Sequence, residues 1–235
     1  MWIYGRHAVA AALQNPHRHQ HKLIATKNAL DWLADQGLEI PIEPSKPHLI
    51  DSALPPGAVH QGLAIKVNAL KDVELEDVCD AKKPGPVVVL DQVTDPQNIG
   101  ALFRVGAAFS AQAMVAQDRR TPPLSGPLAK AAVGAIESLP LVRVVNIARS
   151  LEALREIGFH TIGLAAEAET DLPDFQTDRP VAIVMGAEGS GLRPLVKDTC
   201  ESLMSIPISD SVESLNVATA AGITLYGLVA QKSSA

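Results

Sequence analysis

The side chains best suited to chemistry in this chain lie in three polar segments, each placed where an apolar run ends. Asn98 and Arg104 follow the first run, Glu188 follows the second, and Ser214 and Asn216 follow the third. The loop between a strand and a helix is where α/β proteins usually place ligands, because free backbone N–H groups and the helix dipole point into it. Ser and Asn are also ordinary helix N-caps, so Ser214 and Asn216 could be caps or site residues.

The second segment, Gly186 to Leu192, contains three glycines directly after a strongly apolar run. Glycine lets a backbone approach a flat or charged ligand closely, although tight turns also need it. The segment has neither the G-K-[ST] of a phosphate-binding P-loop nor the G-x-G-x-x-G of a dinucleotide fingerprint, which argues against a nucleotide-binding oxidoreductase. Since Glu188 would repel phosphate, a neutral or cationic ligand is favoured.

Alternating strands and helices are expected to position these segments. Apolar runs predict the strands 22–26, 62–67, 87–90, 113–116, 141–145, 159–164 and 181–185, with a further strand at Ile40 and Ile42. Helical spacing predicts the helices 5–13, 98–110, 128–137 and 147–157, and another helix capped by Asn28. This order is typical of a mostly parallel sheet covered by helices on both faces.

The first of these segments places Gly100 and Arg104 four residues apart, on one face of the helix predicted at 98–110. Gly100 is therefore expected to leave room for a ligand beside the Arg104 side chain. Taken alone, Arg104 would also fit a surface arginine whose aliphatic stem covers apolar neighbours.

A charged, weakly periodic stretch divides the chain into two expected domains. Residues 68–84 read as a linker, and Pro84-Gly85-Pro86 ends it because this sequence cannot continue a helix. Residues 1–67 predict a small α/β domain, and residues 85–235 predict a larger one.

Composition bounds the protein classes that remain. Hydrophobic residues make up 47% and charged residues 20%, as in a globular protein, and the net charge of −6 argues mildly against binding nucleic acid by bulk electrostatics. A local basic face remains open, since Arg6, Arg119 and Lys130 belong to clusters of basic residues. Cys79 and Cys200 lack metal-ligand spacing, so no metal site is expected. No membrane span or signal peptide is evident, and a cytoplasmic location is expected.

The three segments, in this order, resemble the motifs of the SpoU class of SPOUT methyltransferases. These enzymes transfer a methyl group from S-adenosylmethionine to ribose 2′-hydroxyls of tRNA and rRNA. Leu90 to Arg104 resembles the first motif, Ile183 to Leu192 the second and Ile206 to Gly222 the third, and the resemblance covers residues 87–231. Tyr4 to Val9 and His60 to Gly62 are similar to the small RNA-binding domain, of the ribosomal protein L30e type, that precedes the catalytic domain in members acting on a guanosine of large-subunit rRNA.

The resemblance implies an L30e-like domain followed by a SPOUT domain with a C-terminal trefoil knot, in a homodimer formed through the C-terminal domain. It implies S-adenosylmethionine as cofactor, RNA as partner and substrate, and no metal. The implied catalytic residues are Asn98, Arg104, Glu188, Ser214 and Asn216. The residues implied to bind the cofactor are Gly186, Gly189, Leu192, Ile206, Ile208, Leu215 and Val217. The basic residues expected to contact RNA are Arg6, Arg119 and Lys130.

Two alternatives stay open at this point. One is a tRNA 2′-O-methyltransferase, and the other is a non-catalytic RNA-binding or ribosome-assembly protein. Such a protein is expected to have lost Asn98, Arg104 or Asn216, and all three are present. A guanidinium is a poor proton acceptor, so Arg104 is expected to hold a phosphate and stabilise the developing alkoxide.

Overall fold

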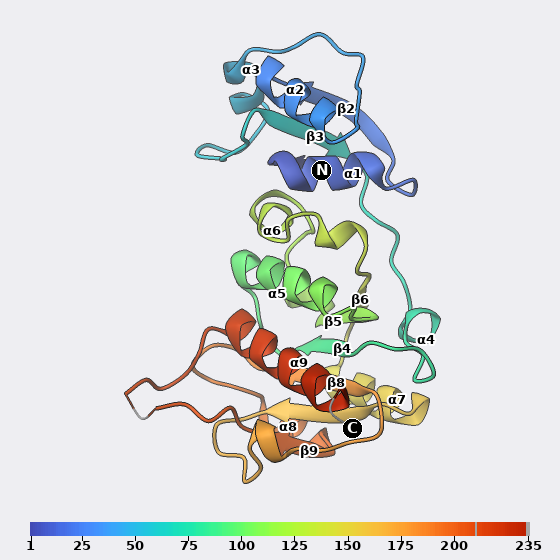
Figure 1. Cartoon of the computed structure of the whole chain (residues 1–235), viewed down its shortest axis with the longest axis vertical. Helices are drawn as coiled ribbons and strands as arrows, with labels where there is room; N and C mark the ends of the chain where they lie inside the picture. Colours follow the sequence, from blue (N-terminus) through green and yellow to red (C-terminus); the bar gives the residue numbers. More distant parts are fainter. Residues whose placement is uncertain (210, 234–235) are drawn as a thin grey trace.

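The computed structural model of the protein describes residues 1–209 and 211–233 and contains two separate sheets (Figure 1). The smaller sheet is antiparallel, with strand order β1-β3-β2, and the larger is parallel, with order β6-β5-β4-β8-β7-β9. This is the predicted α/β fold, with a mostly parallel sheet and a small N-terminal α/β unit. The trefoil knot stays a prediction.

The elements have the following bounds. The strands are β1 (Trp2–Tyr4), β2 (Gln20–Ala25), β3 (Leu63–Val67), β4 (Val87–Leu90), β5 (Ala113–Gln117), β6 (Leu141–Val144), β7 (His160–Leu164), β8 (Val181–Met185) and β9 (Ser202–Met204). The helices are α1 (Arg6–Gln14), α2 (Lys27–Asp35), α3 (Pro47–Asp51), α4 (Leu75–Val78), α5 (Pro96–Ala108), α6 (Gly126–Ala131), α7 (Ile147–Ile157), α8 (Pro194–Thr199) and α9 (Val217–Ser233). Short 3-10 helices are η1 (Asp118–Arg120), η2 (Ala135–Glu137) and η3 (Leu172–Asp174).

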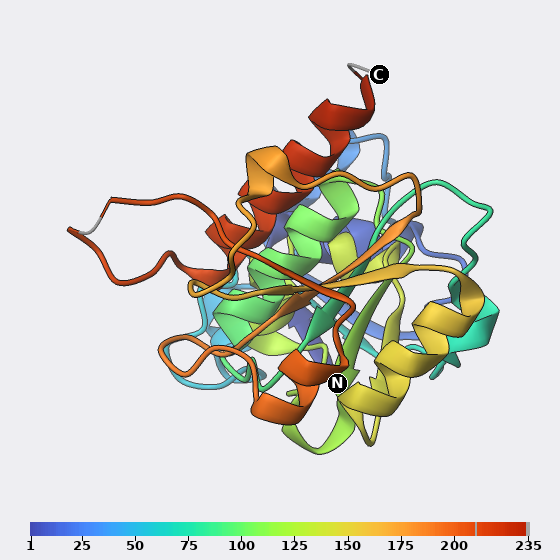
Figure 2. The ribbon, with the colours of Figure 1, turned by 90° about the horizontal axis from the view of Figure 1, so that it is seen from below.

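The large sheet is buried on both faces, as its continuous apolar strands require. Every residue of β4 and β8 is buried. One apolar cluster joins the sheet to α5 and α9, and a second joins the opposite face to α7 and α8. Figure 2 shows the sheet between these two pairs of helices.

Two local predictions in the small N-terminal unit were wrong, and one strand was not predicted. Ile40 and Ile42 form no strand, because the chain turns sharply there and the backbone N–H of Ile42 donates to the carbonyl of Ile40. Asn28 does not cap α2, which begins at Lys27 after Thr26. The strand β1 was missed because three residues give too little periodicity to detect.

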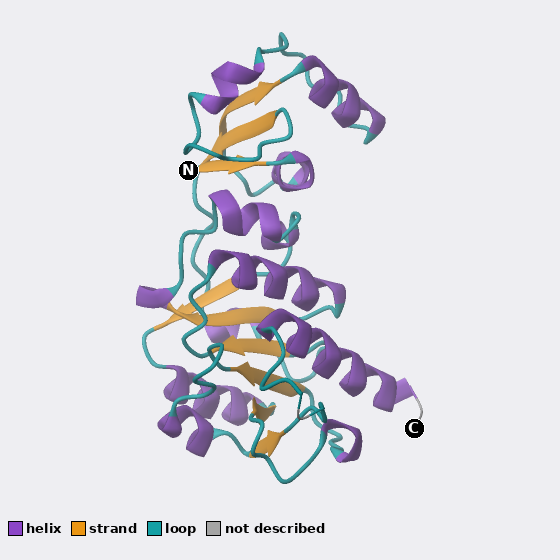
Figure 3. Cartoon of the chain, turned by 90° about the vertical axis from the view of Figure 1, so that its left-hand side faces the viewer, coloured by secondary structure: helices purple, strands orange, loops and turns teal. Residues whose placement is uncertain are grey.

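The small unit packs onto the larger sheet through α6, so that α1, α6 and α5 form successive layers between the two sheets (Figure 3). A single apolar cluster runs from β1 and α1 through α6 into α5. The predicted helix 128–137 is divided into α6 and η2, because Val133 and Gly134 both have positive φ. A Cβ on Gly134 would lie 2.6 Å from the Cβ of Ala11, so glycine allows this close contact.

A buried ion pair reinforces that contact. Arg18 donates to both carboxylate oxygens of Glu137, at 2.6 and 3.0 Å, and to the carbonyl of Asn68 at 2.8 Å. Asn15 also donates to Glu137, at 2.8 Å. The side chains of Arg18 and Glu137 are 0% and 5% exposed. The orientation of the two units is therefore fixed by charged groups that water does not reach.

The segment predicted as a linker is partly built into the larger unit. Val73 pairs in parallel with Val142 of β6, and Leu75 and Cys79 join the apolar cluster beneath α7. The chain between the two units therefore extends the edge of the large sheet. The domain boundaries at 67 and 84 remain predictions.

Candidate active site

One amide side chain joins the three polar segments. The Nδ2 of Asn216 donates to the Oδ1 of Asn98 at 2.9 Å and to the Oε1 of Glu188 at 2.9 Å. Its Oδ1 accepts from the backbone N–H groups of Ala218 and Thr219 at 3.0 and 3.3 Å, which are orphan donors at the start of α9. Asn216 is therefore a helix cap and, through its other end, the link between the two remaining segments.

Strand order explains why these segments meet. β4 and β8 are adjacent and parallel, with Leu90 opposite Met185, so the loops that follow them leave the same edge of the sheet. The first loop leads to Asn98 in α5. Asp95 is the N-cap of this helix, and its side chain accepts from the backbone N–H of Gln97. This is the edge at which open α/β sheets bind ligands.

A buried ion pair holds the second segment against β4. Asp91 is 0% exposed and accepts from the backbone N–H of Arg193 at 2.8 Å and from its Nε at 2.7 Å. Within the loop, the backbone of Ala187 and Gly191 pairs in both directions. A Cβ on Gly186 would lie 2.3 Å from the carbonyl carbon of Gly191, so only glycine fits there.

A cavity of about 330 Å³ opens beside the linked side chains, at the ends of β7, β8 and β9 and before α9. Glu188 and Ser214 lie in its wall. The seven residues predicted to hold the cofactor all line it: Gly186, Gly189, Leu192, Ile206, Ile208, Leu215 and Val217. The structure thus brings together the predicted catalytic and cofactor-binding residues, with the exception of Arg104.

The cavity is acidic. Glu167, Glu188 and Glu213 line it. Among the described lining residues the one ammonium belongs to Lys197, which forms an ion pair with Glu167. The hydrogen bond from Lys197 lowers the pKa of Glu167 and keeps it charged. An acidic wall fits a ligand that carries positive charge.

Arg104 lies apart from this cavity. Its exposed side chain lines a shallow hollow with residues of α1 and η2, including Ala11 and Glu137. The expectation that Gly100 leaves room for a ligand was wrong, because a Cβ there would lie 2.6 Å from the Leu128 carbonyl oxygen and 2.6 Å from the Cβ of Ala131. Gly100 instead allows α6 to approach α5.

Two of the three residues expected to contact RNA meet on one surface. Lys130 of α6 lies against Gly5, next to Arg6, whose guanidinium stacks 5.5 Å from the ring centre of Trp32. Arg119 lies elsewhere, in η1 after β5. The Arg6–Trp32 pair lies within the small unit, and Lys130 of the larger unit lies beside it. Basic and aromatic side chains gathered in this way are typical of surfaces on which unpaired bases stack.

Three further charged residues at this site were not predicted from the sequence: Asp91, Arg193 and Glu167. Asp91 carries a recognisable signal, a carboxylate directly after four apolar residues, where an uncompensated charge would be costly to bury. Arg193 and Glu167 lie in loops whose partners are distant in sequence, so no local pattern identifies them.

Neither a cluster of metal-binding side chains nor a membrane-spanning helix is present in the described residues, 1–209 and 211–233. They contain no group of three or more His, Cys, Asp or Glu side chains placed to hold a metal ion. Their helices are too short or too polar to cross a membrane.

The model of the SpoU rRNA Methylase family matches residues 85–226, and that of the RNA 2′-O ribose methyltransferase substrate-binding domain matches residues 2–73. The chain belongs to the SpoU rRNA methylase family.

Its relatives include several proteins of one name. The chain is 39% identical to the 23S rRNA (guanosine-2'-O-)-methyltransferase RlmB of Vibrio cholerae, over 98% of this chain and 96% of that one. It is 37% identical to RlmB of Escherichia coli, over 98% of each chain. In fold it is similar to the SpoU methyltransferase AviRb of Streptomyces viridochromogenes, whose structure with AdoMet aligns at a TM-score of 0.79 and 23% identity, over 100% of this chain and 91% of that one.

Proposed function

We propose that this protein methylates the ribose 2′-hydroxyl of a guanosine in 23S rRNA, with S-adenosylmethionine as methyl donor. The observation that carries the chemistry is the contact of Asn216 with Asn98 and Glu188 at the mouth of an acidic cavity. The choice of RNA rests on the relatives named RlmB, which align along nearly the whole chain. The expected cytoplasmic location stays a prediction.

The cavity suits the proposed methyl donor. When bound, S-adenosylmethionine supplies an electrophilic methyl group on a cationic sulfur, and the wall formed by Glu167, Glu188 and Glu213 favours a cation. Around Gly186 the backbone approaches so closely that no side chain intervenes. The Asp91–Arg193 ion pair holds this loop in place before any ligand arrives.

The linked side chains can orient the substrate hydroxyl. Asn216 occupies the Oδ1 of Asn98 and one oxygen of Glu188, which turns the amide N–H₂ of Asn98 and the second carboxylate oxygen toward other partners. The Asn98 amide can donate a hydrogen bond to the ribose hydroxyl oxygen, and the free Glu188 oxygen can accept the hydroxyl proton. Ser214, in the cavity wall, adds a hydroxyl beside them.

Arg104 joins this chemistry if a second copy of the chain completes the site. On α9, which packs against α5, the apolar side chains of Ile223 and Tyr226 are 39% and 67% exposed. We therefore place a homodimer contact on the face formed by α5 and α9. Arg104, exposed on the same α5, would hold an RNA phosphate and stabilise the developing alkoxide.

The test separates the two roles of Asn216. In Asn216→Asp the oxygen that caps α9 is kept, while both donors to Asn98 and Glu188 are lost. We expect a folded protein whose methyl transfer to 23S rRNA, measured with radiolabelled S-adenosylmethionine, falls by at least a hundredfold.

The matched control is Asn146→Ala, which removes the N-cap of α7 far from the cavity. It should cost about 1 kcal/mol of stability and leave methyl transfer intact. Equal activity of wild type and Asn216→Asp would refute the site. Mapping 2′-O-methyl groups in RNA from cells with and without the gene identifies the substrate. Loss of a methyl group from tRNA would favour a tRNA methyltransferase. No lost methyl group would favour a non-catalytic protein.

A further inference from the structure

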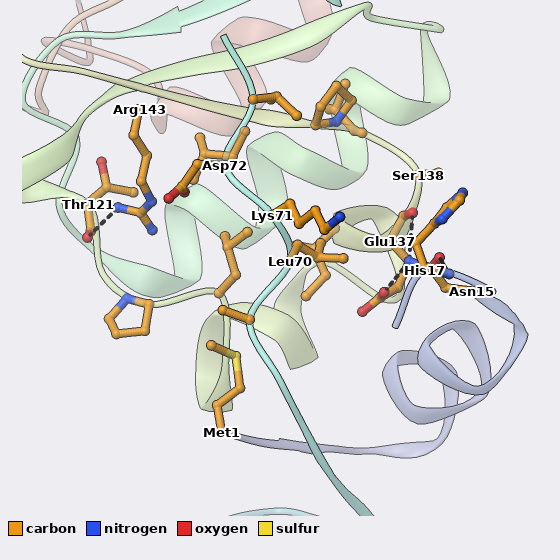
Figure 4. Close-up of a pocket in the computed structure, with 18 residues that line it drawn as sticks. Met1, Asn15, His17, Leu70, Lys71, Asp72, Thr121, Glu137, Ser138 and Arg143 are labelled. Carbon is orange, nitrogen blue, oxygen red and sulfur yellow. Dashed lines mark hydrogen bonds between the residues drawn. The ribbon is translucent and has the colours of Figure 1, made fainter. Parts of the chain in front are cut away.

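A second cavity, of about 660 Å³, lies beside β6, the outer strand on the side of the large sheet away from β9. The proposed methyl-donor site lies at the ends of β7, β8 and β9. It is enclosed by the chain between the two units, by the loop after η1 and by the segment from η2 into β6 (Figure 4). Met1 borders it from the small unit. Its size is in the range of sites for small organic ligands.

Strand pairing brings two opposite charges to this cavity. Val73 pairs in parallel with Val142, and side chains alternate between faces along each strand. Asp72 and Arg143, one residue before and one after the paired valines, therefore project to the same face, and both line the cavity. In Figure 4 their charged ends lie at the same end of it.

These two groups retain bonding capacity. Within the described residues no ion pair joins Asp72 to Arg143, and the Asp72 carboxylate has no hydrogen-bond partner there. Arg143 donates from Nη1 to the carbonyl of Thr121 and from Nη2 to that of Pro122, both at 3.3 Å. Its nearest carboxylate is Asp118, at 3.7 Å. Since a guanidinium has five N–H groups, Nε and two further hydrogens stay available.

The rest of the wall is mainly apolar, although five polar side chains also line it: Asn15, His17, Lys71, Thr121 and Ser138. Leu139, Leu141 and Ile136 are buried beneath the cavity, and Leu70 and Leu124 border it. The other carboxylate in the wall, Glu137, is already neutralised by Arg18. A ligand that fits this wall is flat and apolar on its faces, with hydrogen-bond donors at one edge for a carboxylate and acceptors for a guanidinium.

We propose that this cavity binds a guanine base. The adjacent N1–H and N2–H₂ donors of guanine match the two acceptor oxygens of Asp72, and its O6 and N7 acceptors match Arg143. Adenine presents no such pair of adjacent donors. The base arrives either as a free guanine nucleoside or as an unpaired guanosine of an RNA bound to the protein.

Binding of nucleosides to the full chain tests this proposal by calorimetry, without methyl donor, so the result is independent of methyl transfer. Guanosine, inosine, which lacks the N2 amino group, and adenosine are compared, together with single-stranded hexaribonucleotides containing one guanosine or one adenosine. Guanosine should bind at least tenfold more tightly than adenosine, with inosine between them. If the nucleosides do not bind but the guanosine hexamer is preferred over the adenosine hexamer, the guanine base that the cavity binds belongs to an RNA.

The variant Asp72→Asn should remove that preference and weaken guanine binding at least tenfold. Asp72 is exposed and has no partner among the residues that the structure describes, so the variant should fold normally. Asp77→Asn, a neighbouring exposed carboxylate outside the cavity, is the matched control and should bind as wild type. Equal binding of guanine and adenine ligands, or an unchanged preference in Asp72→Asn, overturns the proposal.

Discussion

Replacing Arg18 with Met should be one of the most destabilising single changes in this protein. The methionine keeps much of the apolar volume but removes the guanidinium that donates twice to Glu137 and once to the Asn68 carbonyl. Glu137 would then be a carboxylate with a 5% exposed side chain and only Asn15 as partner. Breaking a buried pair by removing one charge costs about 3–5 kcal/mol, because the other charge stays buried and uncompensated.

Urea unfolding followed by circular dichroism measures this loss. Lys83→Met is the matched control, since Lys83 and Asp80 are 3.9 Å apart with side chains 72% and 43% exposed, and should cost less than about 1 kcal/mol. The double variant Arg18→Met with Glu137→Leu should recover much of the loss, because it leaves no buried charge. A single-variant loss below about 1 kcal/mol, or purely additive losses in the double variant, would refute the reasoning.

Three further outcomes are expected. Gly186→Ala should abolish S-adenosylmethionine binding in calorimetry while the chain stays folded, since its Cβ would displace the Gly191 carbonyl and distort the loop; normal affinity would contradict this. Burial, followed by the charge of Arg179, lowers the pKa of His160 below its ordinary 6.5. The unfolded chain therefore binds a proton at this site at higher pH than the folded chain does, and the free energy of unfolding should fall as pH drops through 6.5. The variant His160→Gln should lose this part of the pH dependence, measured by urea unfolding. Burial raises the pKa of the Cys79 and Cys200 thiols to about 12, so a thiol reagent at pH 8 should modify them only on unfolding, and rapid labelling of the native protein would count against this.

Most strands of the large sheet could be predicted from runs of apolar residues, and β4, β5, β7 and β8 fall within a residue of their expected positions. Short elements such as β1 and β9 could not, since three residues show no periodicity. The strand expected at Ile40 and Ile42 does not form, because two alternating apolar residues make no strand without a neighbouring strand to pair with.

The spatial arrangement of the predicted site residues could not be read from the sequence. Nothing local shows that β8 inserts beside β4, and this strand order is what brings Glu188 to Asn98. The sequence left Asn216 to be either a cap or a site residue, whereas its amide has two ends, of which one caps α9 and the other bonds to Asn98 and Glu188. Gly100 illustrates the opposite case, since the space expected for a ligand is filled by a neighbouring helix.

The pairing of Val73 with Val142 also matters for how this chain can be divided. β6 is an outer strand of the large sheet, and residues 72–74 shield part of its free backbone groups. A fragment starting at residue 85, where the family model begins, would uncover that strand and offer it to other chains as a template for aggregation. A fragment that keeps residues 70–84 retains this cover, so solubility after truncation should depend on where the cut is made.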